Sequence, residues 1–118
     1  MLNLNHKKLD VWKISIQLCI TIYEVTTNFP SNERYGLVSQ LRRAAVSVSS
    51  NIAEGASRSS TKERRRFYEI SRSSLVEIDT QLEIARNINY LTASEEKVLG
   101  DVLNHLFALI SNLIKSTK

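Results

Sequence analysis

The chain of 118 residues is poor in the residues that build disulfides and tight turns, with one cysteine, one proline and three glycines. A single cysteine excludes an internal disulfide and suits a reducing compartment. So few prolines and glycines argue against an all-β fold, which needs many turns. No run approaches the roughly 18 apolar residues of a membrane span, and no signal-peptide cleavage site follows the first apolar segment. We therefore expect a cytoplasmic protein with no membrane partner.

Histidine is equally scarce, and this leaves little material for catalysis. Nucleophilic catalysis needs Ser or Cys beside a His, but His6 lies near the chain start and His105 lies beside an apolar helix stripe. Di-iron bundles place Glu three residues before each His, and Val102 occupies that position here. No metal-binding CxxC or HExxH and no Gly-rich phosphate loop occurs. We therefore expect a protein without catalytic activity, metal or cofactor.

Most of the chain shows the periodicity of amphipathic helices. Apolar residues spaced for a helix predict helices at about 10–28, 33–54 and 61–89, and a fourth that ends near Ser116. Pro30 ends the first helix, and Gly55 is predicted to cap the second by adopting a positive φ.

Two capping boxes mark where the third and fourth helices begin. Ser60 precedes Glu63 by three residues, and Thr92 precedes Glu95 by the same interval. The expected inner stripe of the third helix is Phe67, Ile70, Ser74, Leu75, Ile78, Leu82 and Ala85.

Short connections between four helices predict an all-α fold, an antiparallel up-down-up-down four-helix bundle that forms one domain over residues 1–118. The first helix carries two apolar stripes, and the fourth is apolar over nearly half of its circumference. This is more apolar surface than one bundle core needs. We therefore expect a homo-oligomer.

Basic residues are concentrated in the middle of the chain. Between residues 31 and 72 there are nine basic and four acidic side chains, and eight of the nine are Arg, whose fork suits phosphate. The candidate nucleic-acid-binding residues are Arg58, Lys62, Arg64, Arg65, Arg66 and Arg72, with Arg42 and Arg43 as secondary candidates. A cluster of this kind attracts polyanions.

The same cluster also fits a solvated helix face. Glu63, Glu69 and Glu77 are close enough in sequence to pair with these arginines. Against this, cations in the first turn of a helix oppose the helix dipole, a small cost that favours a functional reason for placing them there. The sequence leaves both interpretations open.

Several motifs resemble one bacterial family. They are the strings at 9–13 (LDVWK), 29–30 (FP), 33–37 (ERYGL) and 40–55 (QLRRAAVSVSSNIAEG), and Ser74-Leu75 with Glu77. The chain resembles the four-helix-bundle proteins encoded within intervening sequences of bacterial 23S ribosomal RNA genes. It departs from the family at Ser49, where Pro is common, and at Ser73, where Gly is common.

The resemblance implies an antiparallel four-helix bundle that assembles as a ring-like homopentamer. It also extends to the accessory variability determinant of diversity-generating retroelements, a related bundle that binds nucleic acid and a reverse transcriptase. The family motif places Arg43, Ser47, Ser50 and Glu54 on one line of a helix, with Asn51 and Gly55 beside it and Glu77 on the next helix. This line could contact a ligand, but we favour a close contact between helices or subunits.

Two functional hypotheses follow. The first is a non-enzymatic homo-oligomer that binds RNA or DNA through backbone phosphates, with strong salt dependence and weak sequence preference. The alternative is an adaptor whose oligomer docks a protein partner with an acidic surface. A nuclease is disfavoured because no general base or metal cluster is present.

Overall fold

The computed structural model describes all 118 residues, and helices are its only regular elements. The four long helices are α1 (Asp10–Thr26), α2 (Leu37–Ser57), α3 (Thr61–Asn87) and α4 (Ala93–Ser116). Two short 3₁₀ helices precede α1 and α2, η1 (Asn5–Lys8) and η2 (Ser31–Glu33). The all-α class and the four helices are confirmed.

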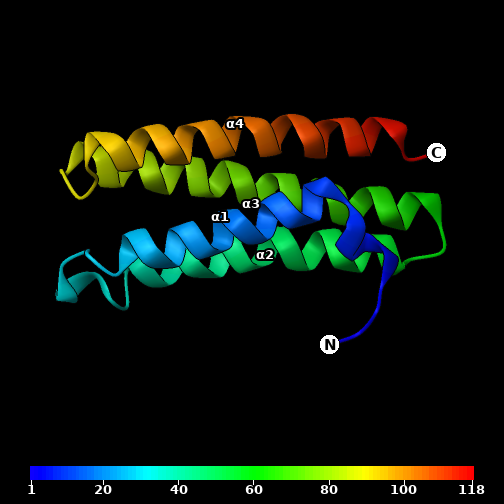
Figure 1. The fold of residues 1–118 in the computed structure, drawn as a ribbon, viewed down its shortest axis with the longest axis horizontal. Helices are drawn as coiled ribbons and strands as arrows, with labels where there is room; N and C mark the ends of the chain where they lie inside the picture. The colour runs from blue at the N-terminus through cyan, green and yellow to red at the C-terminus, as the bar shows by residue number, and fades with distance from the viewer.

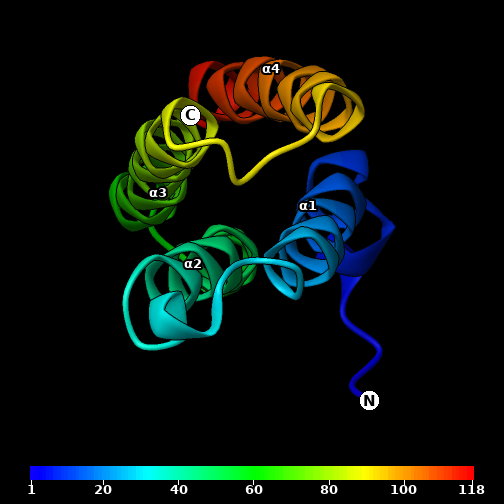
Figure 2. The same ribbon diagram turned by 90° about the vertical axis from the view of Figure 1, so that its left-hand side faces the viewer.

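Consecutive long helices run back and forth along a body of 43 × 26 × 21 Å (Figure 1). Seen end-on, the helices lie in sequence order around a common centre, with α4 next to α1 (Figure 2). Their inward faces form one core. Its fully buried large side chains are Leu18, Ile22, Leu41, Val48, Ile52, Ile78, Leu99, Leu106 and Ile110.

The start of α2 differs from the sequence prediction, which placed it at Glu33. Residues 31–33 form η2 instead, and Gly36 adopts a non-helical conformation with φ −108° and ψ −111°. The helix therefore begins at Leu37. Similarly, α1 ends at Thr26 rather than Asn28, because the chain must leave the helix before Pro30.

Gly55 does not cap α2, contrary to the prediction. The helix continues to Ser57, no glycine has a positive φ, and Gly55 is buried. A Cβ at this position would lie 2.7 Å from the Tyr68 ring and 3.1 Å from the Arg64 carbonyl oxygen. Gly55 is therefore required by the close approach of α3, not by a turn.

The predicted helix starts at Ser60 and Thr92 are confirmed. The Thr92 hydroxyl accepts from the Glu95 amide at 3.1 Å, and the Glu95 carboxylate accepts from the Thr92 amide at 2.9 Å. At Ser60 only half of the predicted box forms, because its hydroxyl accepts from the Glu63 amide without a return bond. At its other end α3 stops at Asn87, and Asn89 turns the chain with φ 64°.

The first turns of α3 bury a different face from the one predicted. Phe67 is half-buried and Ile70 is 37% exposed, whereas Tyr68 and Ser71 are buried. The Ser71 hydroxyl donates to the Val48 carbonyl at 2.8 Å. A small residue is needed at this point because α2 and α3 approach each other closely, so the larger apolar side chains lie to either side.

Helix α4 is less covered than the other core helices. By length and composition it could cross a membrane, a criterion that core helices of soluble proteins also meet. Only 17% of its most apolar window is buried within the chain, and Val98 and Phe107 are exposed. The bundle therefore leaves apolar surface on α4 without a partner.

Candidate nucleic-acid interface

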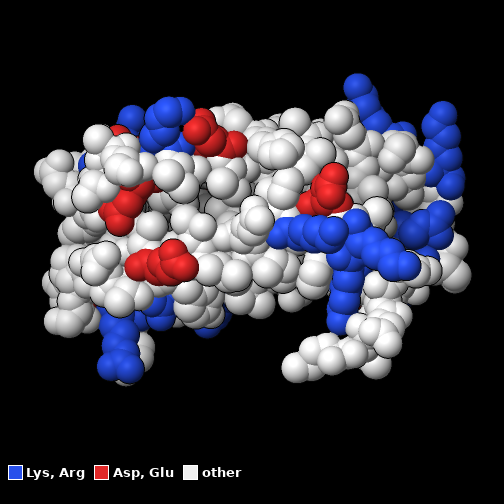
Figure 3. All heavy atoms as spheres, in the orientation of Figure 1, with Lys and Arg blue, Asp and Glu red and all other residues white.

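One end of the bundle gathers most of the positive charge. The fold brings together residues 5–13, 54–69 and 113–118, which we call the basic end. The side chain of Arg65 donates to the Thr117 carbonyl, joining the start of α3 to the end of α4, and Leu4 lies beside Ser57 at the end of α2. Figure 3 shows Lys and Arg concentrated toward this end of the visible face.

Ten of the sixteen basic residues lie in these three segments, together with only four of the twelve acidic ones. The basic residues are Lys7, Lys8, Lys13, Arg58, Lys62, Arg64, Arg65, Arg66, Lys115 and Lys118. The rest of the chain is net acidic, so the charge is divided along the length of the bundle. Such a field orients and attracts a polyanion toward one end.

Two of the predicted contact residues stabilise the α2–α3 connection instead of pointing freely into solvent. The Arg64 guanidinium donates to the carbonyl oxygens of Arg58 and Ser59 at 3.2 and 2.8 Å, and to the Thr61 hydroxyl at 3.1 Å. Arg58 pairs with Glu54 at 3.1 Å and lies over the Phe67 ring. Both contribute positive charge, but their side chains are held by the protein.

Arg65 and Arg72 connect α3 to α4. Besides the bond from Arg65 to the Thr117 carbonyl, the Arg72 guanidinium donates to the Ser111 hydroxyl at 3.2 Å and lies over the Phe107 ring. Arg72 is half-buried. It lies about two turns after Arg65 along α3, just beyond the basic end.

Among the primary candidates, Lys62 and Arg66 have the freest side chains. Both are exposed, and neither forms a hydrogen bond or an ion pair within the chain. Being four residues apart, they lie on one face of α3. With Thr61, Arg65 and Glu69 they line a shallow surface hollow. These two residues can reorient toward a phosphate without breaking a contact.

The secondary candidates lie outside the basic end. Arg42 donates to the Thr26 hydroxyl at 3.0 Å and to the Tyr23 carbonyl at 3.2 Å, and it lies over the Tyr23 ring. It therefore closes the C-terminal end of α1, where a cation is favoured. Arg43 is exposed and has no such contact.

The family motif on α2 mostly contacts neighbouring residues of the fold. The Ser47 and Ser74 hydroxyls lie 2.9 Å apart across the α2–α3 contact, and the Asn51 amide donates to the Ser47 carbonyl and hydroxyl at 2.8 and 3.0 Å. On α3, the Glu77 carboxylate accepts from the Gln81 amide at 3.2 Å. Ser50 is exposed.

Five lysines of the basic end are not part of the cluster predicted from the sequence: Lys7, Lys8, Lys13, Lys115 and Lys118. They come from the two ends of the chain and join the α3 cluster only in three dimensions. The predicted antiparallel topology was the available signal, because it places the starts of the first and third helices beside the ends of the second and fourth.

Few titratable groups are perturbed. Burial, and secondarily the charge of Lys7, lowers the pKa of His6, whose ring forms a T-shaped contact with the Trp12 ring. Burial raises the pKa of the Cys19 thiol, which opposes thiolate chemistry. No three His, Cys, Asp or Glu side chains are grouped as metal ligands.

Known proteins resemble this chain in sequence and in fold. Residues 7–112 match the family described as 23S rRNA-intervening sequence protein. A solved structure from Bacteroides thetaiotaomicron, a protein of unknown function from the S23 ribosomal protein family, shares the fold with a TM-score of 0.80. The two chains are 19% identical, over 90% of this chain and 99% of the other. No curated protein is a match. The chain therefore belongs to the family of 23S rRNA-intervening sequence proteins.

Proposed function

We propose that this protein is a cytoplasmic, non-enzymatic homo-oligomer of up-down-up-down bundles that binds nucleic acid through the basic end. The observation that carries this proposal is the gathering of ten basic side chains from three separate segments. Lys62 and Arg66 make the principal phosphate contacts, because both are exposed and free of internal partners. The resemblance to the family supports a ring-like homopentamer as the assembly.

The chemistry of the basic end favours duplex over single-stranded nucleic acid. Proteins that bind single strands stack bases on exposed aromatic side chains. At the basic end Tyr68 is buried, Phe67 is covered by Arg58, and Trp12 is half-buried against His6. Without a stacking surface, binding depends on phosphate charge, which is denser along a duplex.

The uncovered apolar surface supports self-association. Ile20 on α1 is 53% exposed, Val76 on α3 is 52% exposed, and Val98 on α4 is 49% exposed. Light scattering at micromolar concentration measures this directly. A strict monomer would contradict the homo-oligomer.

The binding test is fluorescence anisotropy with an RNA duplex, a DNA duplex and a single-stranded RNA at several salt concentrations. The double variant Lys62→Glu/Arg66→Glu is compared with Arg34→Glu/Lys97→Glu, which changes the net charge equally outside the basic end. We expect wild type and control to bind the duplexes with affinity that falls steeply with salt, and the Lys62/Arg66 variant to lose binding. Circular dichroism and light scattering verify that the variants remain helical and oligomeric.

The same measurement can reject the proposal. If wild type fails to bind even at low salt, the basic end is a solvated surface and the protein-adaptor hypothesis takes the lead. If the control variant loses binding as completely as the Lys62/Arg66 variant, net charge and not the basic end determines the interaction.

A further inference from the structure

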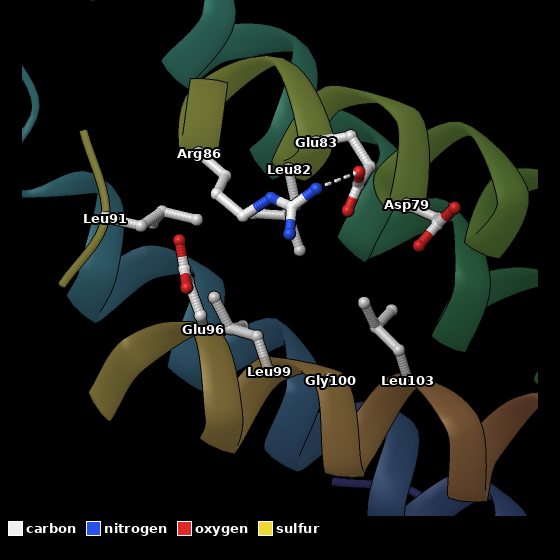
Figure 4. A pocket seen from close by; sticks show the side chains of 9 residues that line it. All are labelled: Asp79, Leu82, Glu83, Arg86, Leu91, Glu96, Leu99, Gly100 and Leu103. Carbon is white, nitrogen blue, oxygen red and sulfur yellow. Dashed lines mark hydrogen bonds and ion pairs between the residues drawn. The ribbon is translucent and has the colours of Figure 1, made fainter. Parts of the chain in front are cut away.

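A second surface feature lies between α3 and α4. Two adjoining hollows, which share Asp79, Gly100 and Leu103, form one groove. Figure 4 shows the section nearer the α3–α4 connection, where leucine side chains from both helices face the hollow and carboxylates stand around them. The apolar lining of the groove comprises Leu75, Val76, Leu82, Leu91, Leu99, Leu103 and Phe107.

Gly100 keeps this groove open. No heavy atom lies within 4 Å of the position that its Cβ would occupy, so the glycine is not explained by packing inside the chain. The rim of the groove is acidic. Glu83 pairs with Arg86 at 2.7 Å, whereas Asp79 and Glu96 have no basic partner. The groove therefore suits an apolar segment that carries positive charge.

The N-terminal segment of the chain has this composition. Met1 is fully exposed, Leu2 is 71% exposed and Leu4 is 45% exposed. Lys7 and Lys8 follow them in the sequence. The backbone at Leu4 is extended, and the Lys7 ammonium donates to the Leu2 carbonyl. We call residues 1–8 the arm.

The arm lies on the opposite side of its own bundle from the groove. Leu4 and His6 lie beside Ser50, Ala53 and Ser57 of α2, and no Cα atom of α2 lies within 8 Å of α4. In Figure 2 the N-terminal segment leaves the bundle on the side of α1 and α2, away from α3 and α4. An arm that fills the groove must come from another copy.

We propose that the arm of one copy docks in the α3–α4 groove of a second copy. Leu2 and Leu4 enter the apolar floor, and Lys7 and Lys8 face the acidic rim. The charge division of the molecule favours this arrangement, because Lys7 and Lys8 of the arm belong to the basic end and the groove borders the acidic part. The inference rests on the homo-oligomer in the proposed function, not on nucleic-acid binding.

Disulfide trapping between two chains, each with a single cysteine at a new position, tests this docking. Both chains carry Cys19→Ser, one has Leu2→Cys, and the other has Gly100→Cys and a size tag. The open space at Gly100 accommodates the new side chain. In the control, the tagged chain carries Val46→Cys in place of Gly100→Cys. Val46 is an exposed residue on α2. After mild oxidation we expect the mixed dimer to be at least several-fold more abundant with Gly100→Cys than with Val46→Cys.

Light scattering on the same chains separates the possible failures. If the chains are oligomeric and the two mixed dimers are equally abundant, the arm does not select the groove and the inference is wrong, while the homo-oligomer stands. If the chains are monomeric, both the inference and the homo-oligomer are wrong. Neither result affects the nucleic-acid measurement, which is made separately.

Discussion

At the residue scale, two glycines on different helices have opposite surroundings. Gly55 leaves no room for a methyl group beside Tyr68, whereas Gly100 faces open space. We expect Gly55→Ala to lower the free energy of unfolding by about 1–3 kcal/mol, the usual cost of overpacking. Gly100→Ala should raise it by about 0.5–1 kcal/mol, because alanine is the better helix former. Urea denaturation measures the free energy of unfolding of both variants. If the two substitutions change it equally, the two glycines do not differ in their surroundings as described.

Tyr90 provides a prediction that depends on pH. Its phenol donates to the Glu33 carboxylate at 3.0 Å, and this hydrogen bond, with secondary contributions from burial and the Glu33 charge, raises the pKa of Tyr90. Because the pKa of Tyr90 is higher in the folded state, the protonated phenol stabilises the fold. This stabilisation is complete below the ordinary tyrosine pKa of about 10 and is lost as the pH rises through the pKa of the folded state.

The variant Tyr90→Phe tests this linkage. We expect the variant to be less stable than wild type at neutral pH, because the hydrogen bond to Glu33 is lost. The difference should shrink at strongly alkaline pH, where the wild-type phenol has also ionised. Urea denaturation of both proteins at the two pH values is the measurement. If the difference in the free energy of unfolding is the same at both pH values, the Tyr90–Glu33 hydrogen bond does not cause the loss of stability in Tyr90→Phe.

At the element scale, small side chains determine how closely α2 and α3 pack. Ser71 is fully buried and its hydroxyl bonds to the Val48 carbonyl. We expect Ser71→Ala to cost about 1 kcal/mol through the lost hydrogen bond, and Ser71→Leu to cost about 1–3 kcal/mol more through overpacking. Ser73→Leu, at an exposed position on α3, is the matched control. Thermal or urea unfolding measures the stability of each variant. If Ser73→Leu is destabilised as much as Ser71→Leu, the explanation by close packing at Ser71 is wrong.

The elements also show what the sequence could predict. The caps at Ser60 and Thr92 are local interactions, so the starts of α3 and α4 were predictable. The inner face of the first turns of α3 was not predictable. The helical pattern favours burial of the apolar Ile70 over the polar Ser71, but the close approach of α2 buries Ser71 instead. Gly55 was misassigned for a related reason: glycine is expected both where a helix ends and where two helices touch.

At the scale of the whole molecule, the distribution of charge in three dimensions differs from its distribution along the sequence. The sequence identified the dense stretch on α3, but not that Arg58, Arg64 and Arg65 are held by contacts within the protein. These contacts depend on side-chain geometry that periodicity does not encode. Replacing Arg64 or Arg65 would therefore disturb structure and charge together, which makes Lys62 and Arg66 the better positions for testing binding.

The basic end predicts that residues far apart in sequence contribute to one binding surface. For a duplex, each lysine or arginine that contacts a phosphate contributes about 1 to the slope of log affinity against log salt. We expect Lys62→Ala/Arg66→Ala to reduce this slope by about 2, and Lys115→Ala/Lys118→Ala at the end of α4 to reduce it as well. Arg34→Ala/Lys97→Ala should leave the slope unchanged. If only the α3 variant changes the slope, the binding surface is confined to the start of α3, because the lysines of α4 then make no phosphate contact.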